Sequence, residues 1–367
     1  MPPAAHPYIF AAFAFALGAV VGSFLNVCIY RLPLDLSVSH PKRPFCPHCQ
    51  QQIPWYQNLP LFSRLLLRGK CANCGGRISI RYFAVELLTA LLFVAIWLRF
   101  PWMLALPYWV LLSLFVVATF IDFDHFIIPD EVTIGGTIAG LGLSFAIPAL
   151  MGVESHFAAL LWSATGAAGG YVLLWGVVVA GKAVFGRKRI GFNPPAPFSW
   201  RRDGDSATLT VDGKTEPWAE FFPDEKAVLR MKCASVEFDG QTHANIEVTS
   251  LYEKLTVAGR DYDLNNVESF SGKFAEVVFE RDAMGFGDVK FIACIGAFLG
   301  WQAVAFTVVA ASLLGSIVGV ATLAFHRREW SANIPFGPYL ALGATIWMFA
   351  GPVVAAWYLN LVRLPEM

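Results

Sequence analysis

Long apolar stretches are the feature that most restricts how this 367-residue chain can fold. A run of about 18 or more apolar residues is long enough to cross a bilayer as a helix. Apolar residues make up 56% of the chain, and runs that meet or approach this length recur along it. The sequence predicts an α-helical polytopic membrane protein. We expect about eight transmembrane helices, near residues 8–29, 82–98, 103–121, 132–151, 157–181, 289–300, 303–325 and 336–361.

The basic residues give the expected orientation of these helices. Outside residues 187–282 there are 14 Lys and Arg residues, and 12 of them fall on one side if the N-terminus lies outside. Lys and Arg are enriched in cytoplasmic loops. We therefore expect residues 31–81, 122–131, 182–288 and 326–335 in the cytoplasm. Because this rule also explains the basic stretch 31–81, no nucleic-acid partner is expected.

Four cysteines in the first cytoplasmic segment form two C-x-x-C pairs, Cys46 with Cys49 and Cys71 with Cys74. Four thiolates at this spacing suit a tetrahedral zinc site. Disulfides or a redox pair are the alternatives, but a reducing cytoplasm disfavours structural disulfides. We predict a structural zinc ion on these four residues. Between the pairs, residues 58–68 are typical of a short amphipathic helix lying against membrane lipids.

Two groups of acidic residues lie at the ends of apolar runs on the expected cytoplasmic face. Asp122, Asp124 and Asp130 follow the third run, and Asp288 opens the sixth. An acid at the end of a membrane helix is costly and is a functional-site hypothesis by default. Asp122 directly follows its run and should be the best buried of the three. Asp124 can simply face water, and a preceding proline favours Asp130 as the cap of the next helix.

The stretch Met284-Gly-Phe-Gly-Asp-Val-Lys290 places two glycines directly before the second acid. Glycine allows tight turns and a close approach of another backbone. Gly285 and Gly287 can therefore form a loop that presents Asp288 beside a bound peptide. We expect both glycines and Lys290, together with Asp124 and Asp130, to support this site.

Residues 187–282 differ in composition from the rest of the chain. They hold 13 basic and 17 acidic residues and contain no apolar span. Apolar and polar residues alternate in four stretches, which predicts strands, and Asp212-Gly213 and Ala258-Gly259 are placed for turns. We predict an inserted, mostly β, soluble cytoplasmic domain, with strands at 207–213, 226–232, 245–251 and 273–280.

Together these residues resemble the type IV prepilin peptidase family, which are membrane aspartic proteases with a Gly-x-Gly-Asp motif. The matching pieces occur in the family's order and cover essentially all of the chain except 187–282. They are Gly22-Ser-Phe-Leu-Asn-Val27, Arg31-Leu-Pro33, the two C-x-x-C pairs, Val85-Glu86, the cluster from Asp122 to Asp130, Met284 to Lys290, and Pro335-Phe-Gly-Pro338.

The resemblance implies a function and a site. Asp122 and Asp288 would be the catalytic pair. The substrates would be prepilins or pseudopilins with a short basic leader, cut after a glycine on the cytoplasmic side of the bacterial inner membrane. Family members with the Cys-rich loop also methylate the new N-terminus with S-adenosylmethionine, so this second activity is expected too, without residues assigned to it.

The resemblance also gives the expected domain order. It comprises a first transmembrane helix (1–30), a cytoplasmic zinc-binding loop (31–81), transmembrane helices 2–5 with the first catalytic Asp (82–186), the insertion (187–282), and the Gly-x-Gly-Asp motif with transmembrane helices 6–8 (283–367). The insertion is longer than the family's usual loop. We expect it to gate the site or to dock a partner from pilus assembly or secretion.

Two other function classes remain as alternatives. A proton-coupled transporter requires acids near the bilayer midplane and inverted repeats, whereas both acid groups here lie at helix ends on one face. A non-catalytic zinc-bearing scaffold would depend on the four cysteines and not on Asp288.

Overall fold

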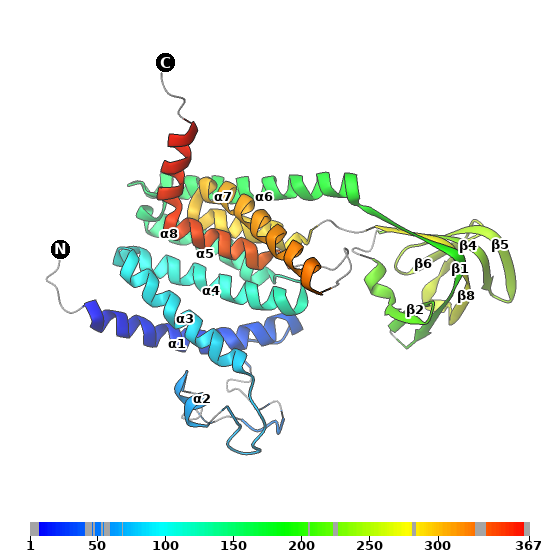
Figure 1. Cartoon of the computed structure of the whole chain (residues 1–367), viewed down its shortest axis with the longest axis horizontal. Helices are drawn as coiled ribbons and strands as arrows, with labels where there is room; N and C mark the ends of the chain where they lie inside the picture. The colour runs from blue at the N-terminus through cyan, green and yellow to red at the C-terminus, as the bar shows by residue number, and fades with distance from the viewer. Residues whose placement is uncertain are drawn as a thin grey trace. The chain divides into compact units, whose positions relative to one another are not determined.

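The chain folds into a helical unit and a β unit (Figure 1). The helical unit comprises Met1–Trp175 and Gly285–Met367, and the β unit comprises Gly176–Met284. The computed structural model describes residues 7–40, 46, 48–52, 54, 59–67, 69–204, 206–222, 227–280, 284–326 and 335–362. Residues 282, 327 and 328, in the segments expected to be cytoplasmic, lie outside the described residues. So do residues 58 and 68 of the expected helix at 58–68 and residue 226 of the expected strand at 226–232.

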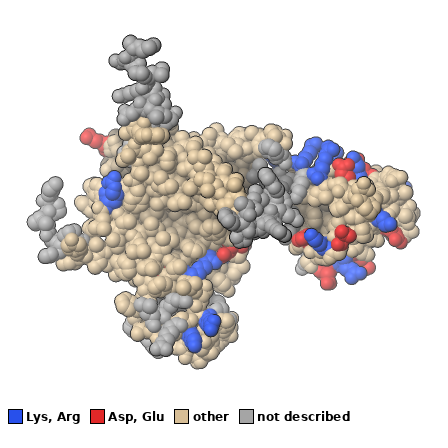
Figure 2. Space-filling view, viewed as in Figure 1, with Lys and Arg blue, Asp and Glu red and all other residues tan. Residues whose placement is uncertain are grey.

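Apolar runs form the helices of the first unit. The helices are α1 (Pro7–Arg31), α2 (Phe62–Leu66), α3 (Ile80–Arg99), α4 (Trp102–His125), α5 (Asp130–Ala146), α6 (His156–Phe185), α7 (Phe286–His326) and α8 (Gly337–Val362), with short 3₁₀ turns at Leu32–Leu34 and Pro148–Met151. Figure 2 shows few charged residues over this unit, which is what a surface in contact with lipid requires.

Five helices in the described part of the chain are long and apolar enough to cross a membrane, which supports a membrane protein. They are Tyr8–Leu34, Ile80–Arg99, Trp102–His125, His156–Val184 and Phe286–Thr322. The expectation of eight spans is therefore not met. The runs 289–300 and 303–325 lie within α7, which is interrupted only where Gly300 adopts φ 78° and ψ 176°. The run 132–151 gives the 17-residue α5 followed by a 3₁₀ turn. The expected span at 336–361 forms α8, which is not among these five helices.

Small residues and buried hydrogen bonds hold the helices together. A Cβ atom added to Gly166 of α6 would lie 2.3 Å from the carbonyl oxygen of Gly296 in α7, so only glycine allows this contact. One turn before Gly166 in α6, the Ser163 hydroxyl donates to the Ala297 carbonyl of α7 at 2.6 Å. Asn26 of α1 donates to the Tyr82 carbonyl of α3 at 3.0 Å. Polar side chains commonly join membrane helices in this way.

The β unit is one antiparallel sheet of eight strands in the order β3-β2-β1-β8-β4-β5-β6-β7. The expected β-rich insertion is thus confirmed. The strands are β1 (Arg187–Asp203), β2 (Ser206–Val211), β3 (Lys214–Pro217), β4 (Leu229–Phe238), β5 (Gln241–Ser250), β6 (Lys254–Val257), β7 (Arg260–Asp263) and β8 (Ser269–Glu280). Figure 2 shows Lys, Arg, Asp and Glu residues intermixed on its surface.

Two-residue turns with φ > 0 at both positions connect three of the strand pairs. Asp212-Gly213 joins β2 to β3 and Ala258-Gly259 joins β6 to β7, as predicted, and Asp239-Gly240 joins β4 to β5. Positive φ at both turn residues matches the right-handed twist of the paired strands. Local sequence therefore determines much of the strand pairing.

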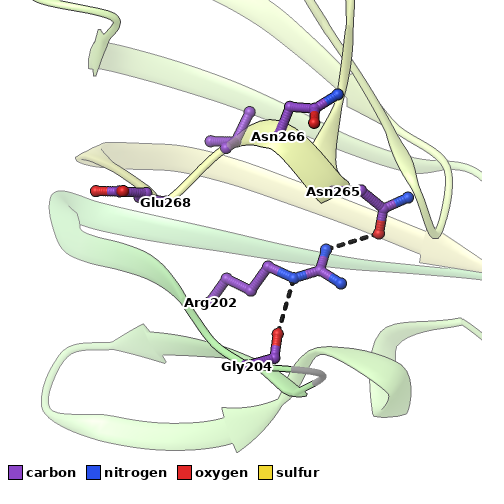
Figure 3. A pocket seen from close by; sticks show the side chains of 6 residues that line it. Arg202, Gly204, Asn265, Asn266 and Glu268 are labelled. Atoms are coloured by element: carbon purple, nitrogen blue, oxygen red, sulfur yellow. Dashed lines mark hydrogen bonds between the residues drawn. The ribbon is translucent and has the colours of Figure 1, made fainter.

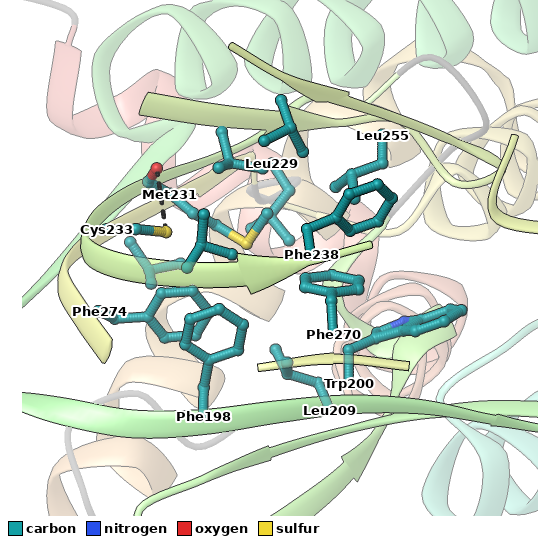
Figure 4. Close-up of a cluster of buried hydrophobic side chains, with 14 of the residues drawn as sticks. Phe198, Trp200, Leu209, Leu229, Met231, Cys233, Phe238, Leu255, Phe270 and Phe274 are labelled. Atoms are coloured by element: carbon teal, nitrogen blue, oxygen red, sulfur yellow. Dashed lines mark hydrogen bonds between the residues drawn. The ribbon is translucent and has the colours of Figure 1, made fainter. Parts of the chain in front are cut away.

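Alternating side chains of the sheet form the hydrophobic core of the β unit (Figure 4). Along β4, Leu229 and Met231 are buried, whereas Arg230 and Lys232 face outward. The Phe198 and Phe274 rings stack with centroids 3.6 Å apart, which joins β1 to β8. Arg187, the first residue of β1, is paired with Glu280, the last residue of β8, so the chain enters and leaves the sheet through adjacent residues.

Candidate functional site

The ends of three helices bring the two acidic groups together in the helical unit. Asp122 lies in the last turn of α4 and Asp288 in the first turn of α7, and their side chains are only 5% and 8% exposed. Both line a cleft of about 200 Å³. The remaining residues of the cleft come from the segment before α5, from α5 itself and from the glycine loop: Phe126, Ile127, Ile128, Asp130, Gly285, Phe286, Gly287 and Lys290.

Asp122 is held by a backbone group from a distant part of the chain. The Gly337 N–H, at the start of α8, donates to Asp122 Oδ2 at 2.9 Å, and this hydrogen bond is buried. A Cβ atom at position 337 would lie 2.8 Å from the same oxygen. Glycine therefore allows this close approach without displacing the Asp122 carboxyl group. The sequence of Pro335-Phe-Gly-Pro338 suggests a segment that walls the site, but it does not predict this hydrogen bond from Gly337.

Asp288 has a different environment. Its Oδ1 atom is buried and has no hydrogen-bond partner among the described residues. The Asp288 N–H donates to the Gly285 carbonyl at 3.2 Å, which closes the glycine loop. A Cβ atom at Gly287 would lie 3.3 Å from Cβ and N of Ile128, whereas one at Gly285 would lie 3.6 Å from Asp288 Oδ2. Gly287 is thus sterically constrained, whereas Gly285 is not.

The other two predicted acids are both paired with a basic side chain. Asp124 is exposed, does not line the cleft, and forms an ion pair with Arg81 at the start of α3. Asp130 accepts a hydrogen bond from Lys290 Nζ at 2.6 Å. The prediction that Asp130 caps α5 is wrong, because Pro129 is the N-cap residue and Asp130 begins the helix. Partly exposed pairs of this kind are worth only about 0–1 kcal/mol each, so their main effect is on geometry.

The four cysteines of the C-x-x-C pairs form a second candidate site. Their sulfur atoms all lie within 4.8 Å of one another, and the four residues are free thiols rather than disulfides. This donor set and spacing fit one tetrahedral metal ion. Backbone hydrogen bonds from Cys74 and Asn73 lower the pKa of Cys71 to about 6, whereas at Cys74 a backbone hydrogen bond from Gly76 is outweighed by desolvation and the neighbouring thiols, which raise the pKa of Cys74 to about 11. Four thiols this close together therefore do not all ionise easily without a cation, and metal binding is coupled to their deprotonation.

The two cysteine pairs have the same backbone structure. In the first, the Cys46 N–H donates to the Gln51 carbonyl and the Gln50 N–H donates back to Cys46; in the second, Cys71 exchanges the same bonds with Gly76 and Gly75. The residue after each pair has φ near 60°, with 57° at Gln50 and 68° at Gly75. The two equivalent turns aim their thiols at a common point.

The cysteine loop is tied to the helices by a carboxylate. Glu86 of α3 accepts a hydrogen bond from the Leu61 N–H at 2.8 Å. Leu61 directly precedes α2, a helix of only five residues, which is shorter than the expected helix at 58–68. Phe62 and Leu66 of α2 are 66% and 77% exposed, so the helix presents apolar side chains outward.

The β unit contains its own cavity (Figure 3), with a volume of about 410 Å³. It is lined by polar groups, among them Arg202 and Glu268. The Arg202 guanidinium is already bonded to the Gly204 carbonyl at 3.0 Å and to Asn265 Oδ1 at 2.8 Å. None of the predicted site residues lines this cavity.

Comparisons with known proteins agree over nearly the whole chain. Residues 16–100 match the bacterial peptidase A24 N-terminal domain, and residues 109–192 and 264–320 match the type IV leader peptidase family. The gap between the last two ranges lies inside the β unit. No solved structure matches the chain.

Curated relatives named prepilin leader peptidase/N-methyltransferase come from several bacteria. One from Myxococcus xanthus is 32% identical over 355 residues, covering 95% of this chain and 75% of the relative. One from Aeromonas hydrophila is 27% identical and covers 96% and 95%. One from Pseudomonas aeruginosa is 27% identical and covers 97% and 96%. The chain therefore belongs to the type IV leader peptidase family.

Proposed function

We propose that this protein is a prepilin leader peptidase that also methylates the N-terminus it exposes. The observation that carries the peptidase proposal is the joint burial of Asp122 and Asp288 at one cleft. Asp122 and Asp288 are 166 residues apart in sequence. A buried acid at the end of a membrane helix is costly and indicates a functional site. The substrates are prepilins or pseudopilins with a basic leader, cut after a glycine.

The chemistry follows from two neighbouring carboxyl groups that share a buried cleft. Two such groups cannot both ionise easily, so one keeps a proton and the other acts as a base. The ionised carboxylate takes a proton from water, which attacks the scissile carbonyl, while the protonated partner stabilises the developing oxyanion. Arg81 and Lys290 are paired with Asp124 and Asp130, which leaves Asp122 and Asp288 for this role.

The glycines, Lys290, Asp124 and Asp130 support the site in this proposal. Gly287 lets α7 begin against Ile128, which sets the position of Asp288. The Lys290–Asp130 and Arg81–Asp124 pairs fix the starts of α5 and α3 relative to the catalytic helices.

The four cysteines would hold a structural zinc ion, which cross-links the two turns of the loop. The equivalent backbone turns and the convergence of four sulfur atoms support this assignment. We assign S-adenosylmethionine as the methyl donor from the names of the relatives, and no residue is assigned to methyl transfer.

The protein would lie in the inner membrane with its cleft and cysteine loop facing the cytoplasm. The positions of Lys and Arg support this orientation. The exposed Phe62 and Leu66 would then rest against membrane lipids. The domain order 1–30, 31–81, 82–186, 187–282 and 283–367 follows from the same topology.

Cleavage of a model prepilin by the purified enzyme in detergent tests the peptidase proposal. Asp122→Asn and Asp288→Asn should each abolish cleavage, and Asp124→Asn should retain it as the matched control. Each variant must keep its zinc content and thermal transition. Cleavage by either of the first two variants would sink the mechanism, and loss in Asp124→Asn alone would move the base to that residue.

We propose that the β unit gates the site or docks a pilus-assembly or secretion partner. Its position before the Gly-x-Gly-Asp loop and its polar surface support this role. Replacing residues 187–282 with a short Gly/Ser bridge tests it. Unchanged cleavage together with unchanged pilus assembly and secretion in cells would refute a gating or docking role.

A further inference from the structure

At the N-terminus of α8, one backbone N–H group donates to a carboxyl group of another helix. The first N–H groups of a helix have no partner inside the helix. Pro338 has no N–H, and Tyr339 and Leu340 donate to the Phe336 carbonyl at 3.1 and 3.2 Å. The Gly337 N–H instead donates to Asp122 Oδ2. The free donor at the start of a 26-residue helix is therefore directed at one of the two central carboxyl groups.

This contact favours a negative charge on Asp122. A hydrogen bond from an N–H to a carboxylate is stronger than one to a neutral acceptor, so the Gly337 amide stabilises the ionised form of Asp122. Asp288 has no comparable donor, because its buried Oδ1 is without a partner in the described part of the chain. A buried carboxyl group without donors is best accommodated in its neutral form.

The charged groups on the neighbouring helices do not reverse this difference. Near Asp122 on its own helix, Asp124 is paired with Arg81 of α3 and His125 is exposed. Lys290 of α7 is paired with Asp130 of α5. Other titratable groups at these helix ends are Glu131 of α5, which is exposed, Glu86 of α3, bonded to the Leu61 N–H, and Arg31 of α1, bonded to the Ser37 carbonyl. The phenols Tyr82 of α3 and Tyr339 of α8 also lie at these ends and are neutral groups at physiological pH.

From these contacts we propose that the Gly337 amide is a positioning group that keeps Asp122 ionised, so that Asp122 is the general base and Asp288 carries the proton. The inference rests on the proposed peptidase function and deepens it, because the shared-carboxyl mechanism alone does not say which acid has which role.

The assignment gives a balanced reaction. Asp122 takes a proton from water as the water oxygen bonds to the scissile carbonyl carbon, and Asp288 gives its proton to the carbonyl oxygen. In the second step the C–N bond breaks, the leaving amine takes the proton from Asp122, and Asp288 regains a proton from the tetrahedral hydroxyl. Both carboxyl groups return to their starting states.

Infrared difference spectroscopy of aspartate-labelled protein in detergent tests the two charge states without requiring activity. The double variant Asp122→Asn/Asp288→Asn serves as the reference that subtracts all other aspartates. At neutral pH, Asp288→Asn should show an ionised carboxylate from Asp122, and Asp122→Asn should show a protonated carboxyl from Asp288. The opposite pattern overturns the assignment.

A kinetic test isolates the Gly337 amide. A Cβ atom at position 337 would lie 2.8 Å from Asp122 Oδ2 and 2.9 Å from Ile128 Cδ1. Ile128→Val removes that Cδ1 atom, so the carboxyl group of Asp122 provides the nearest remaining contacts of Gly337→Ala in this background. Gly142→Ala is the matched control, because Gly142 of α5 has no neighbouring atom within 4 Å of an added Cβ.

We expect Gly337→Ala/Ile128→Val to lower kcat/KM for prepilin relative to Ile128→Val alone, with KM little changed. The loss should be about tenfold to a hundredfold at acidic pH, the range for a hydrogen bond to a charged group, and should shrink as pH rises and Asp122 ionises without help. A loss that is equal at all pH values indicates a merely structural role and refutes the inference. Cleavage by Asp122→Asn or Asp288→Asn would instead refute the proposed function.

Discussion

The two glycines of the Gly-x-Gly-Asp loop should differ sharply in their tolerance of a methyl group. A Cβ atom at Gly287 would lie 3.3 Å from Cβ and N of Ile128, closer than the optimal carbon separation of about 3.5–4.0 Å. The three nearest contacted atoms, Cβ, N and O of Ile128, are backbone or Cβ atoms, which no change of side-chain rotamer can move away. A Cβ atom at Gly285 would make only an ordinary contact, 3.6 Å from Asp288 Oδ2.

Neither glycine needs left-handed backbone, so alanine is not strained at either position and the available space distinguishes the two Gly→Ala changes. Relief of the contact at Gly287 must displace Ile128 or the start of α7 by a few tenths of an ångström. Overpacking of this kind costs about 1–3 kcal/mol. If most of that cost falls on the alignment of Asp288, Gly287→Ala should lower kcat/KM roughly tenfold to a hundredfold. Gly285→Ala should lower it less than about threefold, since it has no such cost.

The assay is prepilin cleavage under single-turnover conditions, with the thermal transition of each variant as the folding control. Ile128→Val should not rescue Gly287→Ala, because valine keeps the Cβ atom that is contacted. Equal losses for Gly285→Ala and Gly287→Ala, or no loss for either, would refute the steric reasoning. Rescue by Ile128→Val would show that the wrong Ile128 atoms have been identified.

Three further outcomes follow from contacts outside the glycine loop. Purified protein should contain one zinc ion per chain by mass spectrometry. Cys71→Ser should remove this ion and make the cysteine loop sensitive to limited proteolysis. Full metal content in this variant would contradict the four-thiolate site. Glu86→Ala should expose the same loop to protease because it removes the acceptor of the Leu61 N–H, whereas Glu86→Gln, which keeps an acceptor oxygen, should protect it; equal cleavage of both variants would contradict the anchoring role. A double-mutant cycle on Lys290 and Asp130 should give a coupling free energy below about 1 kcal/mol that falls with added salt, since both side chains are partly exposed; a larger, salt-independent value would show that the pair is a buried part of the site.

The sequence located the acidic residues of the cleft but not their hydrogen bonds. Asp122 and Asp288 stood out because acids are rare at the ends of long apolar runs. The role of Gly337 could not be predicted in this way, because a backbone amide carries no residue-specific signal and its partner is 215 residues away. The pairing of Asp130 with Lys290 could not be predicted because the two residues are 160 positions apart, and local sequence instead favoured a helix cap.

In the β unit, prediction succeeded where turns are local and failed where strands are irregular. The expected stretches at 207–213, 245–251 and 273–280 fall on β2, β5 and β8. β1 was missed because Pro194, Pro195 and Pro197 interrupt its pattern. The structure accommodates Pro194 and Pro195 within a shift of register between Gly191 and Ala196, where β1 is not paired to β8, whereas Pro197 lies opposite Lys273 in the paired part of the strand. Prolines are tolerated at such irregularities because no ladder hydrogen bond is lost there.

The pairing of Arg187 with Glu280 makes the length of the inserted segment almost irrelevant to the helices on either side of it. Closing a flexible loop costs more as the loop grows, by about 0.6 kcal/mol for each doubling, but a folded module whose first and last residues are hydrogen-bonded neighbours behaves like a short rigid turn. The connection between α6 and α7 is thus a natural attachment point. Other compact modules with adjacent termini, such as a fluorescent reporter or an affinity domain, should be exchangeable at the same two residues without changing how the helices assemble.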